Sequence, residues 1–401
     1  MKTLDYIDIF AGCGGLSLGL CKSGFRGLFA IEKNHDAFST FEYNLITNSQ
    51  KFNWPQWLPL SEHDINTLIK EYHKKLQELS GKITLVAGGP PCQGFSMAGK
   101  RNVNDQRNQL VISYVRFIKI IMPEAIVFEN VHGFTVDFKK ENGKGSKYSN
   151  YVINALNRLG YTTSSRIVDM REFGIPQSRK RFILIAMQHH NPDTVFDKLL
   201  KNKNAFLSRN NLPLNSTVKD AIGDLKMSYG TVDSPDTKGF KAGVYGNTTS
   251  TYQEYLRKGI DISAKTVVDS HRFVNHSPQV ILLHQNLLEK AMRGKRITPS
   301  DGIVEGLKRR GVTVLDADKP APTITSIPDE VVHYEEPRIL TVREHARIQS
   351  FPDWFQFKGK YTSGGKRRKY EVPRYTQVGN AVPPLFAEQI GLALREVLCD
   401  E

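Results

Sequence analysis

The chain has 401 residues, of which 39% are hydrophobic and 24% are charged, as is typical of a folded protein large enough for one or two domains. Lys and Arg exceed Asp and Glu by 55 − 41 = 14, which favours a polyanionic partner such as nucleic acid, although basic proteins without such a partner are common. No apolar run approaches the roughly 18 residues of a membrane span. Asp5 and Asp8 interrupt the stretch in which a signal peptide would need apolar residues, so we expect a cytoplasmic protein that does not enter a membrane.

The cysteines are few and irregularly spaced. They are Cys13, Cys21, Cys92 and Cys399. None belongs to a C-x-x-C pair, and no group of Cys and His has the spacing of zinc ligands. We therefore expect reduced thiols and no metal site.

The first half of the chain alternates short β-rich runs with amphipathic stretches. The expected strands are 6–10, 27–32, 83–89, 125–130 and 181–187. The expected helices lie near 15–22, 35–47, 109–121 and 149–159. This alternation predicts an α/β fold with a mostly parallel, doubly wound sheet that helices cover on both faces.

From about 190 to 330 the pattern loosens into segments rich in Asn, Thr, Gly and Pro, and 278–292 is the clearest helix. Helical periodicity returns over 341–351 and 379–398. We therefore expect a second, smaller and loop-rich domain. The predicted divisions are 1–190 for the first domain, 191–335 for the second, and 336–401 for a return to the first.

A glycine turn, DIFAGCGGLSLGL (8–20), joins the first expected strand to the first helix. Gly12, Gly14 and Gly15 allow the backbone to approach a ligand closely where the helix begins. The spacing departs from G-x-G-x-x-G because Ser17 stands at the third glycine position. Taken alone, the turn indicates no more than a nucleotide-like ligand.

Two carboxylates follow this turn in the sequence. Glu32 closes the second expected strand, where an acidic residue can bind ribose hydroxyls. Asp64 follows an extended stretch and can accept a hydrogen bond from an adenine amino group. Either residue taken singly is also compatible with a solvated surface acid.

The stretch GGPPCQGFS (88–96) places Cys92 directly after the third expected strand, at the edge where parallel α/β sheets hold their chemistry. Pro90 and Pro91 restrict the backbone before it, which mere packing of a cysteine does not need. The polar residues 96–109 suggest a lid over this thiol, which would make it a nucleophile. The basic residues of the lid are Lys100, Arg101 and Arg107.

The next expected strand ends in Glu129 and Asn130, again at the carboxyl edge. A partly desolvated carboxyl group at this edge can act as an acid beside a nucleophile. Arg179 and Arg181 are two residues apart, so in a strand their side chains point to one face. Such arginines require an anion or a carbonyl, and Glu129 is one candidate.

The motifs follow one another along the chain in the order DIFAGCGG, Glu32, HDI, GGPPCQGFS, FENV, PQSRKRFILIA, LTVREHARIQSFPD and QVGNAVPP. In this order they resemble the motifs of the cytosine-C5 DNA methyltransferases. The match covers 5–187 and 337–396. The resemblance implies a Rossmann-like, S-adenosylmethionine-dependent methyltransferase core. It also implies that 191–335 is a target-recognition domain, where KPAPTITS (319–326) is the one recognisable motif.

The same resemblance implies S-adenosyl-L-methionine as cofactor. It places Phe10 against the adenine, Glu32 on the ribose hydroxyls, and Asp64 with Ile65 at the adenine edge. Gly379 belongs to the late motif that would return the C-terminal helix to this site. The implied cofactor-binding residues are Phe10, Gly12, Gly14, Gly15, Glu32, Asp64, Ile65, Pro90, Asn380 and Val382.

The implied reaction is methylation of cytosine at C5. Addition of the Cys92 thiolate at C6 makes C5 electron-rich enough to attack a sulfonium methyl group. Glu129, protonated, would hold N3, and Arg181 would bind O2. Arg179 would support Glu129 or contact a phosphate. The sequence does not identify the base that removes the C5 proton.

The implied partner is double-stranded DNA, with the target base rotated out of the helix as in other methyltransferases. The implied DNA contacts are Gln93, Ser96, Lys100, Arg107 and Thr323. Basic clusters at 290–296, 307–310 and 364–370 fit either the DNA backbone or a solvated surface. We expect a monomeric modification enzyme of the prokaryotic type, associated with the nucleoid through DNA. A cognate restriction endonuclease acting independently is an open partner.

Three other interpretations remain. An RNA cytosine-C5 methyltransferase would share every catalytic residue, but we would expect a shorter insert before the LTVREHA motif. An NAD-dependent dehydrogenase would use the glycine turn and Glu32 but would leave Cys92 and Glu129 idle. A non-enzymatic DNA-binding module would not explain a nucleophile beside a cofactor pocket. We favour the DNA-modifying enzyme.

Overall fold

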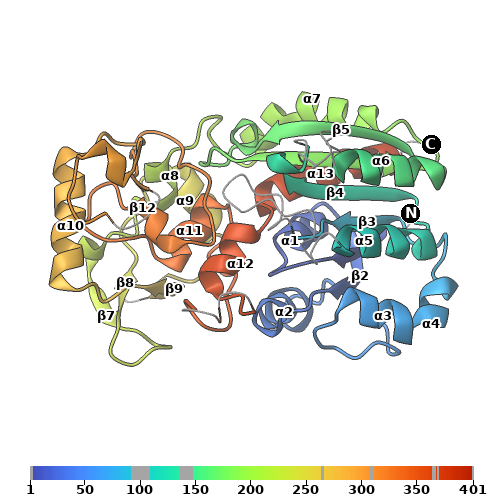
Figure 1. Cartoon of the computed structure of the whole chain (residues 1–401), viewed down its shortest axis with the longest axis horizontal. Helices are drawn as coiled ribbons and strands as arrows, with labels where there is room; N and C mark the ends of the chain where they lie inside the picture. The colour runs from blue at the N-terminus through green and yellow to red at the C-terminus, as the bar shows by residue number, and fades with distance from the viewer. Residues whose placement is uncertain are drawn as a thin grey trace. The chain divides into compact units, whose positions relative to one another are not determined.

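The structure is a computed structural model that describes residues 3–91, 109–135, 148–262, 266–307, 311–363, 367 and 370–399. The chain forms two compact units (Figure 1). Unit 1 comprises Met1–Asp169, Lys180–Lys203 and Phe386–Glu401, and unit 2 comprises Met170–Arg179 and Asn204–Leu385. The catalytic and target-recognition roles expected for 1–190, 191–335 and 336–401 stay predictions.

Unit 1 is built on one six-stranded sheet with the strand order β2-β1-β3-β4-β6-β5. Its strands are β1 (Asp5–Ile9), β2 (Arg26–Ile31), β3 (Leu85–Gly88), β4 (Ala125–Val131), β5 (Thr162–Asp169) and β6 (Lys180–Met187). The first four run parallel, whereas β6 runs antiparallel to both β4 and β5. The expected mostly parallel α/β sheet is confirmed. The sequence prediction missed β5 because this edge strand is largely polar and exposed.

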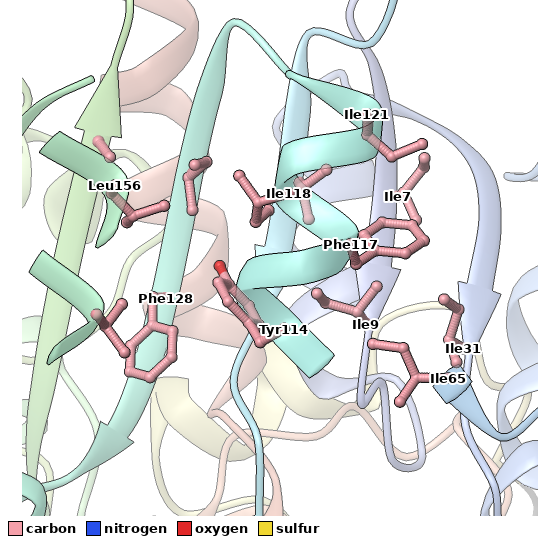
Figure 2. Packing of buried hydrophobic residues seen from close by; sticks show 14 of the residues in the cluster. Ile7, Ile9, Ile31, Ile65, Tyr114, Phe117, Ile118, Ile121, Phe128 and Leu156 are labelled. Carbon is pink, nitrogen blue, oxygen red and sulfur yellow. The ribbon is translucent and has the colours of Figure 1, made fainter. Parts of the chain in front are cut away.

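One face of this sheet is covered by α3 (Ile65–Glu71), α4 (His73–Glu78), α5 (Gln109–Ile121) and α6 (Tyr148–Arg158). The buried positions of α5 recur every three or four residues, which turns a continuous apolar stripe towards the strands. Figure 2 shows Phe117 and Ile121 of α5 beside Ile7 of β1. Complete burial of such side chains contributes about 1.5–3 kcal/mol each, so this layer holds the sheet rigid beneath the strand ends.

The opposite face is covered by α1 (Gly15–Lys22), α13 (Pro384–Cys399) and α7 (Asp193–Arg209). The Tyr6 hydroxyl of β1 donates to the carbonyl of Ser17 in α1 at 3.3 Å. A Cβ at Gly19 would lie 2.4 Å from the Cβ of Ala387, so α1 and α13 pack with almost no space between their backbones. Asn202 of α7 donates to Glu396 of α13 at 3.0 Å. Helices therefore cover both faces of the sheet, as the doubly wound prediction requires. The remaining helix of unit 1, α2 (His35–Glu42), continues into a π-helical turn, Tyr43–Thr47.

Unit 2 has short elements joined by long connections. Its two three-stranded sheets have the orders β7-β8-β9 and β10-β11-β12. The strands are β7 (Thr231–Asp233), β8 (Lys241–Val244), β9 (Val267–Arg272), β10 (Arg296–Ile297), β11 (Val312–Val314) and β12 (Val331–Val332). The helices are α8 (Val218–Ile222), α9 (Thr251–Arg257), α10 (Pro278–Lys290), α11 (Val342–Ile348) and α12 (Arg374–Asn380). This matches the expected loop-rich character, and α10 is the helix expected over 278–292.

The helical periodicity over 379–398 is divided between two helices. In the structure α12 ends at Asn380 and α13 begins at Pro384. Pro383 and Pro384 lack the N–H that would continue the first helix, and each disfavours helical backbone in the residue before it. Pro384 is well suited to the first position of a new helix, so the apolar periodicity continues across a break.

Buried ion pairs hold unit 2 together. Arg338 donates to both carboxylate oxygens of Glu344, at 2.8 and 2.7 Å, with neither side chain more than marginally exposed. Arg347 similarly donates to Asp353 at 2.9 and 2.6 Å and also pairs with Asp224. Removing one partner would leave a buried charge without compensation, which costs about 3–5 kcal/mol. The LTVREHARIQSFPD motif therefore supplies much of the interior of this unit.

Asp8 of β1 is a buried acid beneath the glycine turn. It is fully shielded from solvent; its Oδ2 accepts a 2.6 Å hydrogen bond from Ser17, and its Oδ1 has no hydrogen-bond partner. Burial raises the pKa of Asp8 to about 7. The hydrogen bond from Ser17 opposes this shift, and the nearby Glu32 carboxylate adds to it. The native protein therefore favours the neutral acid at this position.

As the pH rises from 5 to 8, we expect the free energy of unfolding to fall less in Asp8→Asn than in the wild type. The native wild type retains a proton on Asp8 that the unfolded chain, with an ordinary Asp pKa near 4, has released. Its free energy of unfolding therefore falls as the pH rises towards 7, by about 4 kcal/mol at most. Urea unfolding across this range measures the slope.

Asp193→Asn is the matched control. The Ser164 hydroxyl and Arg166 lower the pKa of this exposed carboxyl, so its stabilising effect is lost only under more acidic conditions. The control should keep the wild-type slope between pH 5 and pH 8. Equal slopes for wild type and Asp8→Asn would contradict the proposed protonation.

Candidate active site

The ends of β1, β3 and β4 meet at one edge of the unit 1 sheet. Ile9, Gly88 and Phe128 occupy one register row across the three strands. A Cβ at Gly88 would lie 1.9 Å from the carbonyl oxygen of Ile9, and one at Gly89 would lie 1.8 Å from that of Glu129. The backbone after β3 thus fits between its neighbours only because these two residues are glycines.

The glycine turn that follows β1 has left-handed backbone at Phe10, Gly12 and Gly14, with φ of 61°, 57° and 94°. Glycine adopts this conformation freely, but a residue with a side chain does so at a cost of about 1–3 kcal/mol. Phe10 is held there while its ring packs against the core cluster. Gly14 precedes α1 as its N-cap. The turn therefore leads from a packed aromatic residue to the start of a helix.

Glu32 ties the end of β2 to this turn. Its Oε2 accepts from the Gly12 N–H at 2.9 Å, and its Oε1 accepts from the Asn34 N–H at 2.8 Å. Burial raises the pKa of Glu32, and these backbone hydrogen bonds oppose the shift. A carboxylate has about four lone-pair sites, so two bonds leave capacity to accept from ligand hydroxyls. The predicted ribose contact is compatible with this geometry and stays a prediction.

The backbone just before Asp64 is joined to the end of β2, because the His63 N–H donates to the carbonyl of Glu32 at 2.7 Å. Its Oδ1 caps α3 by accepting from the N–H groups of Asn66 and Thr67, and its Oδ2 lies 3.2 Å from Lys33 Nζ. Desolvation opposes ionisation, but Lys33 and the helix amides prevail and lower the pKa of Asp64.

The Ile65 side chain is buried in the core cluster, close to Ile31 in Figure 2. Only the backbone of Ile65 is therefore suited to the predicted adenine contact. Asp64 already has a structural role as a helix cap, and its own adenine contact stays a prediction.

Glu129 and Arg181 form an ion pair at the end of β4. Arg181 Nε lies 2.9 Å from Glu129 Oε1, with side-chain exposures of 10% and 16%. The pairing depends on the antiparallel direction of β6, which starts at this edge and sets Arg181 opposite Val131, diagonal to Glu129. Arg181 Nη1 donates to the carbonyl of Lys180. Within the described residues Nη2 has no hydrogen-bond partner, so one donor of the guanidinium is available at the edge.

Asn130 anchors the turn that leads to Cys92. Its buried Nδ2 donates to the carbonyl of Pro90 at 3.1 Å, and its Oδ1 accepts from the Val131 N–H at 2.9 Å. The expected role of Pro90 in cofactor binding is untested. The sequence marked Asn130 as a strand end but gave no signal for this bond, because the bond joins residues 40 positions apart.

Arg179 lies one residue before β6 and belongs to unit 2. The two arginines are expected to bind an anion or a carbonyl. Arg181 pairs with a carboxylate, that of Glu129, whereas Arg179 donates to backbone carbonyls. The Arg179 guanidinium donates to Ile324, Gly379 and Ala381 at 3.0–3.1 Å. These bonds favour a scaffolding role within unit 2, and the predicted catalytic role is untested.

The remaining predicted residues fall in unit 2 or outside the described part of the chain. The Thr323 hydroxyl donates to the carbonyl of Ser178 at 2.6 Å. Asn380 is exposed at the end of α12, and Val382 is half-buried just beyond it. The predictions for Cys92, Gln93, Ser96, Lys100 and Arg107 lie outside the described residues. Within the described ranges, no group of three His, Cys, Asp or Glu side chains is arranged to hold a metal ion, and no helix is long and apolar enough to span a membrane.

The edge thus combines a glycine turn with left-handed backbone, a carboxyl group paired with an arginine, and an anchored turn that in the sequence precedes a cysteine. Comparison with known proteins shows the family of the chain. A sequence profile of the C-5 cytosine-specific DNA methylases matches residues 4–396. The chain belongs to this family. It is a DNA (cytosine-5-)-methyltransferase, and the family implies DNA as substrate and S-adenosylmethionine as methyl donor.

Relatives of this methyltransferase align along nearly the whole chain. The type II methyltransferase M.XorII of Xanthomonas oryzae is 31% identical over 404 residues, covering 98% of this chain and 84% of the relative. M1.HphI of Haemophilus parahaemolyticus is 30% identical over 408 residues, covering 100% and 88%.

Solved structures agree with the fold. A protein encoded within an E. coli prophage and assigned as a DNA modification methyltransferase has 25% identity and a TM-score of 0.66, with 99% of each chain covered. The S. pombe Dnmt2 methyltransferase has 15% identity and a TM-score of 0.55, with both chains covered completely, and shows the fold alone.

We expect Asn130→Ala to lower the turnover number by about 10- to 100-fold with little change in cofactor affinity. Loss of the hydrogen bond leaves the buried Pro90 carbonyl without its donor, which costs about 1–3 kcal/mol, and a small displacement of a nucleophile slows chemistry strongly. Steady-state methyl transfer and calorimetric cofactor binding measure the two effects.

Asn157→Ala is the control. It removes an exposed hydrogen bond that Thr163 donates to Asn157 at 2.9 Å, at the opposite end of β6 from Arg181. It should keep wild-type turnover. An Asn130→Ala variant with full turnover would show that the Pro90 turn needs no such anchor.

Proposed function

We propose that the chain transfers a methyl group from S-adenosyl-L-methionine to C5 of a cytosine rotated out of duplex DNA, through a covalent bond between Cys92 and C6. The observation that supports this most directly is the Glu129–Arg181 pair beside the Pro90 turn. It provides an acid and a hydrogen-bond donor for a pyrimidine at the place where the chain leads to a thiol.

The turn after β1 and the end of β2 fit the cofactor. The left-handed backbone at Gly12 and Gly14 opens the helix start to a ligand, and Glu32 is fixed by two amides with acceptor capacity left for hydroxyls. Phe10, Gly15, Asp64, Ile65, Pro90, Asn380 and Val382 would complete the site. When bound, the cofactor supplies an electrophilic methyl group.

The residues of the chain would act on the cytosine. The Cys92 thiolate forms a bond to C6, and the electron pair of the C5–C6 double bond becomes available at C5. Glu129 in its protonated form holds N3, and the available Nη2 of Arg181 holds O2, so both stabilise the charge that builds on the ring. After C5 has gained the methyl group and lost its proton, the C6–S bond breaks and the thiolate is regenerated.

The relatives favour a role in a restriction-modification system, because M.XorII and M1.HphI are both type II methyltransferases. We propose double-stranded DNA as the partner, contacted by Gln93, Ser96, Lys100, Arg107 and Thr323. A cognate restriction endonuclease would act independently on the same sequence. A monomer in the cytoplasm is the form that we expect.

We expect Cys92→Ser to bind DNA and cofactor but to lose methyl transfer. A serine hydroxyl is far less nucleophilic than a thiolate, so the first bond to C6 does not form at a useful rate. Tritium transfer from labelled S-adenosylmethionine to duplex DNA measures the loss. Cys399→Ser, at an exposed position, should retain activity.

Duplex DNA that carries 5-fluorocytosine at the target should trap the wild-type enzyme as an adduct on denaturing gels, because fluorine is not removed as a proton is. RNA of the same sequence should give none. Turnover by Cys92→Ser, or no adduct with the correct DNA site, would exclude the covalent route.

We expect Glu32→Gln to raise the dissociation constant of S-adenosylmethionine at least about tenfold, equivalent to about 1.4 kcal/mol. The substituted amide turns an NH₂ group towards a backbone N–H and removes an acceptor from the hydroxyl site. Isothermal titration calorimetry measures the change. Glu62→Gln, beside the exposed His35, is the control, and equal affinities for both variants would refute the ribose contact.

A further inference from the structure

One arginine of unit 2 is positioned by unusual backbone. Arg272 ends β9, which pairs with β8 in the three-stranded sheet of Figure 1. The register shifts between Ala242 and Val244, and the buried Ser270 has a φ of 61°. A bulge of this kind redirects the side chains that follow it, and left-handed backbone in a residue with a side chain persists only where the surroundings enforce it.

Two aromatic rings hold the Arg272 side chain. Its guanidinium carbon lies 4.1 Å from the ring centre of Phe240 and 3.7 Å from that of Tyr361. Tyr361 is fixed in turn, because its hydroxyl donates to Asp236 at 2.9 Å. Stacking on rings restricts the planar guanidinium without using its N–H groups.

The N–H groups of Arg272 have no acceptor in the part of the chain that the structure describes. Its Nε is buried without a hydrogen-bond partner, and among the described residues nothing accepts from its terminal nitrogens. The nearby carboxylate of Asp236 is already bound by Arg374 at 2.7 Å and by Tyr361. Arg338 and Arg347 of the same unit differ, since both donate to buried carboxylates.

A purely structural arginine would be expected to satisfy its donors, because an unpaired polar group in a partly buried site costs free energy. The arrangement around Arg272 instead resembles a site that awaits an acceptor. The guanidinium geometry matches two oxygens of one anionic group. Because the rings already restrict the side chain, binding such a group costs little further conformational entropy.

We propose that Arg272, held between Phe240 and Tyr361, binds a phosphodiester group of the target DNA. This inference rests on the proposed function, since it takes duplex DNA as the partner. It assigns a DNA contact to the β7-β8-β9 sheet, where the sequence resemblance indicated no residue. A phosphate contact positions the protein on the duplex and contributes to affinity through counterion release.

The test compares DNA binding by full-length wild type, Arg272→Gln and Arg272→Lys. Binding is measured by fluorescence anisotropy with a duplex that contains the target sequence of the enzyme. We expect Arg272→Gln to weaken binding about tenfold near 0.15 M salt and to reduce the slope of log K against log salt by about one. Arg272→Lys should keep the slope and lose part of the affinity, because it keeps the charge without the paired donors.

Arg166→Gln is the matched control. Arg166 also lies over a ring, 5.1 Å from the centre of Phe196, but it is paired with Asp193 at 3.2 Å in unit 1. Its replacement removes the same charge from the protein and should leave DNA binding unchanged. Thermal unfolding and cofactor binding of each variant confirm that the fold is retained. Should Arg272→Gln fail to fold, Phe240→Leu, which loosens the clamp and keeps the charge, should weaken DNA binding while its cofactor binding is retained.

Two results would overturn the inference. In the first, Arg272→Gln, or Phe240→Leu in its place, binds DNA as tightly as Arg166→Gln does. In the second, the loss of DNA affinity is confined to duplexes with the target sequence, and the slope of log K against log salt is unchanged. This result would indicate a base contact in place of a phosphate contact. A wild-type protein that binds and methylates no DNA would instead refute the proposed function itself.

Discussion

The chemistry of unit 1 depends on a steric constraint at the end of β3. Gly88 and Gly89 pass so close to the carbonyl oxygens of Ile9 and Glu129 that a single methyl group at either position would overlap a backbone atom. Because the backbones are in contact, the residues that follow β1, β3 and β4 emerge side by side. The glycine turn after β1, the Pro90 turn and Glu129 are therefore neighbours as a result of strand packing, before any side chain has formed a bond.

The antiparallel strand adds the second requirement of the site. A parallel strand next to β4 would bring its own carboxyl end to this edge, whereas β6 brings its amino end. The amino end carries the basic residues, and Arg181 thus reaches Glu129. The chain combines an acidic residue, Glu129, from the end of one strand with a basic residue, Arg181, from the start of another. A purely parallel sheet would keep these two strand ends at opposite edges.

Much of unit 1 could be predicted from the sequence because its strands and helices carry their own periodicity. The helices at 15–22 and 109–121 are at the expected residues. Edge strand β5 could not be found in this way, since exposed positions leave an edge strand without an apolar run. The break between α12 and α13 was present in the sequence as Pro383-Pro384, but the apolar spacing on either side concealed it.

Unit 2 was harder to predict for a different physical reason. Its interior depends on pairs such as Arg338–Glu344 and Arg347–Asp353, and charged residues that will be buried look the same in a sequence as charged residues on a surface. The Asn130–Pro90 and Arg272–Tyr361 contacts were also hidden, because each joins distant positions. Motif order predicted the reacting groups of the site, whereas the contacts that surround them, such as the bond from Asn130 to Pro90, required coordinates.

The packing of α13 against α1 has a consequence for how the protein is made. A close helix contact of unit 1 joins Gly19 to Ala387, so the second helical layer of the sheet cannot be completed until the chain as far as α13 has left the ribosome. The long segment between them, which includes all of unit 2, is synthesised before α13 covers its part of that sheet. Such long-range closure slows folding and exposes apolar surface in the meantime. The nascent chain therefore exposes apolar surface of the kind that chaperones bind until α13 docks.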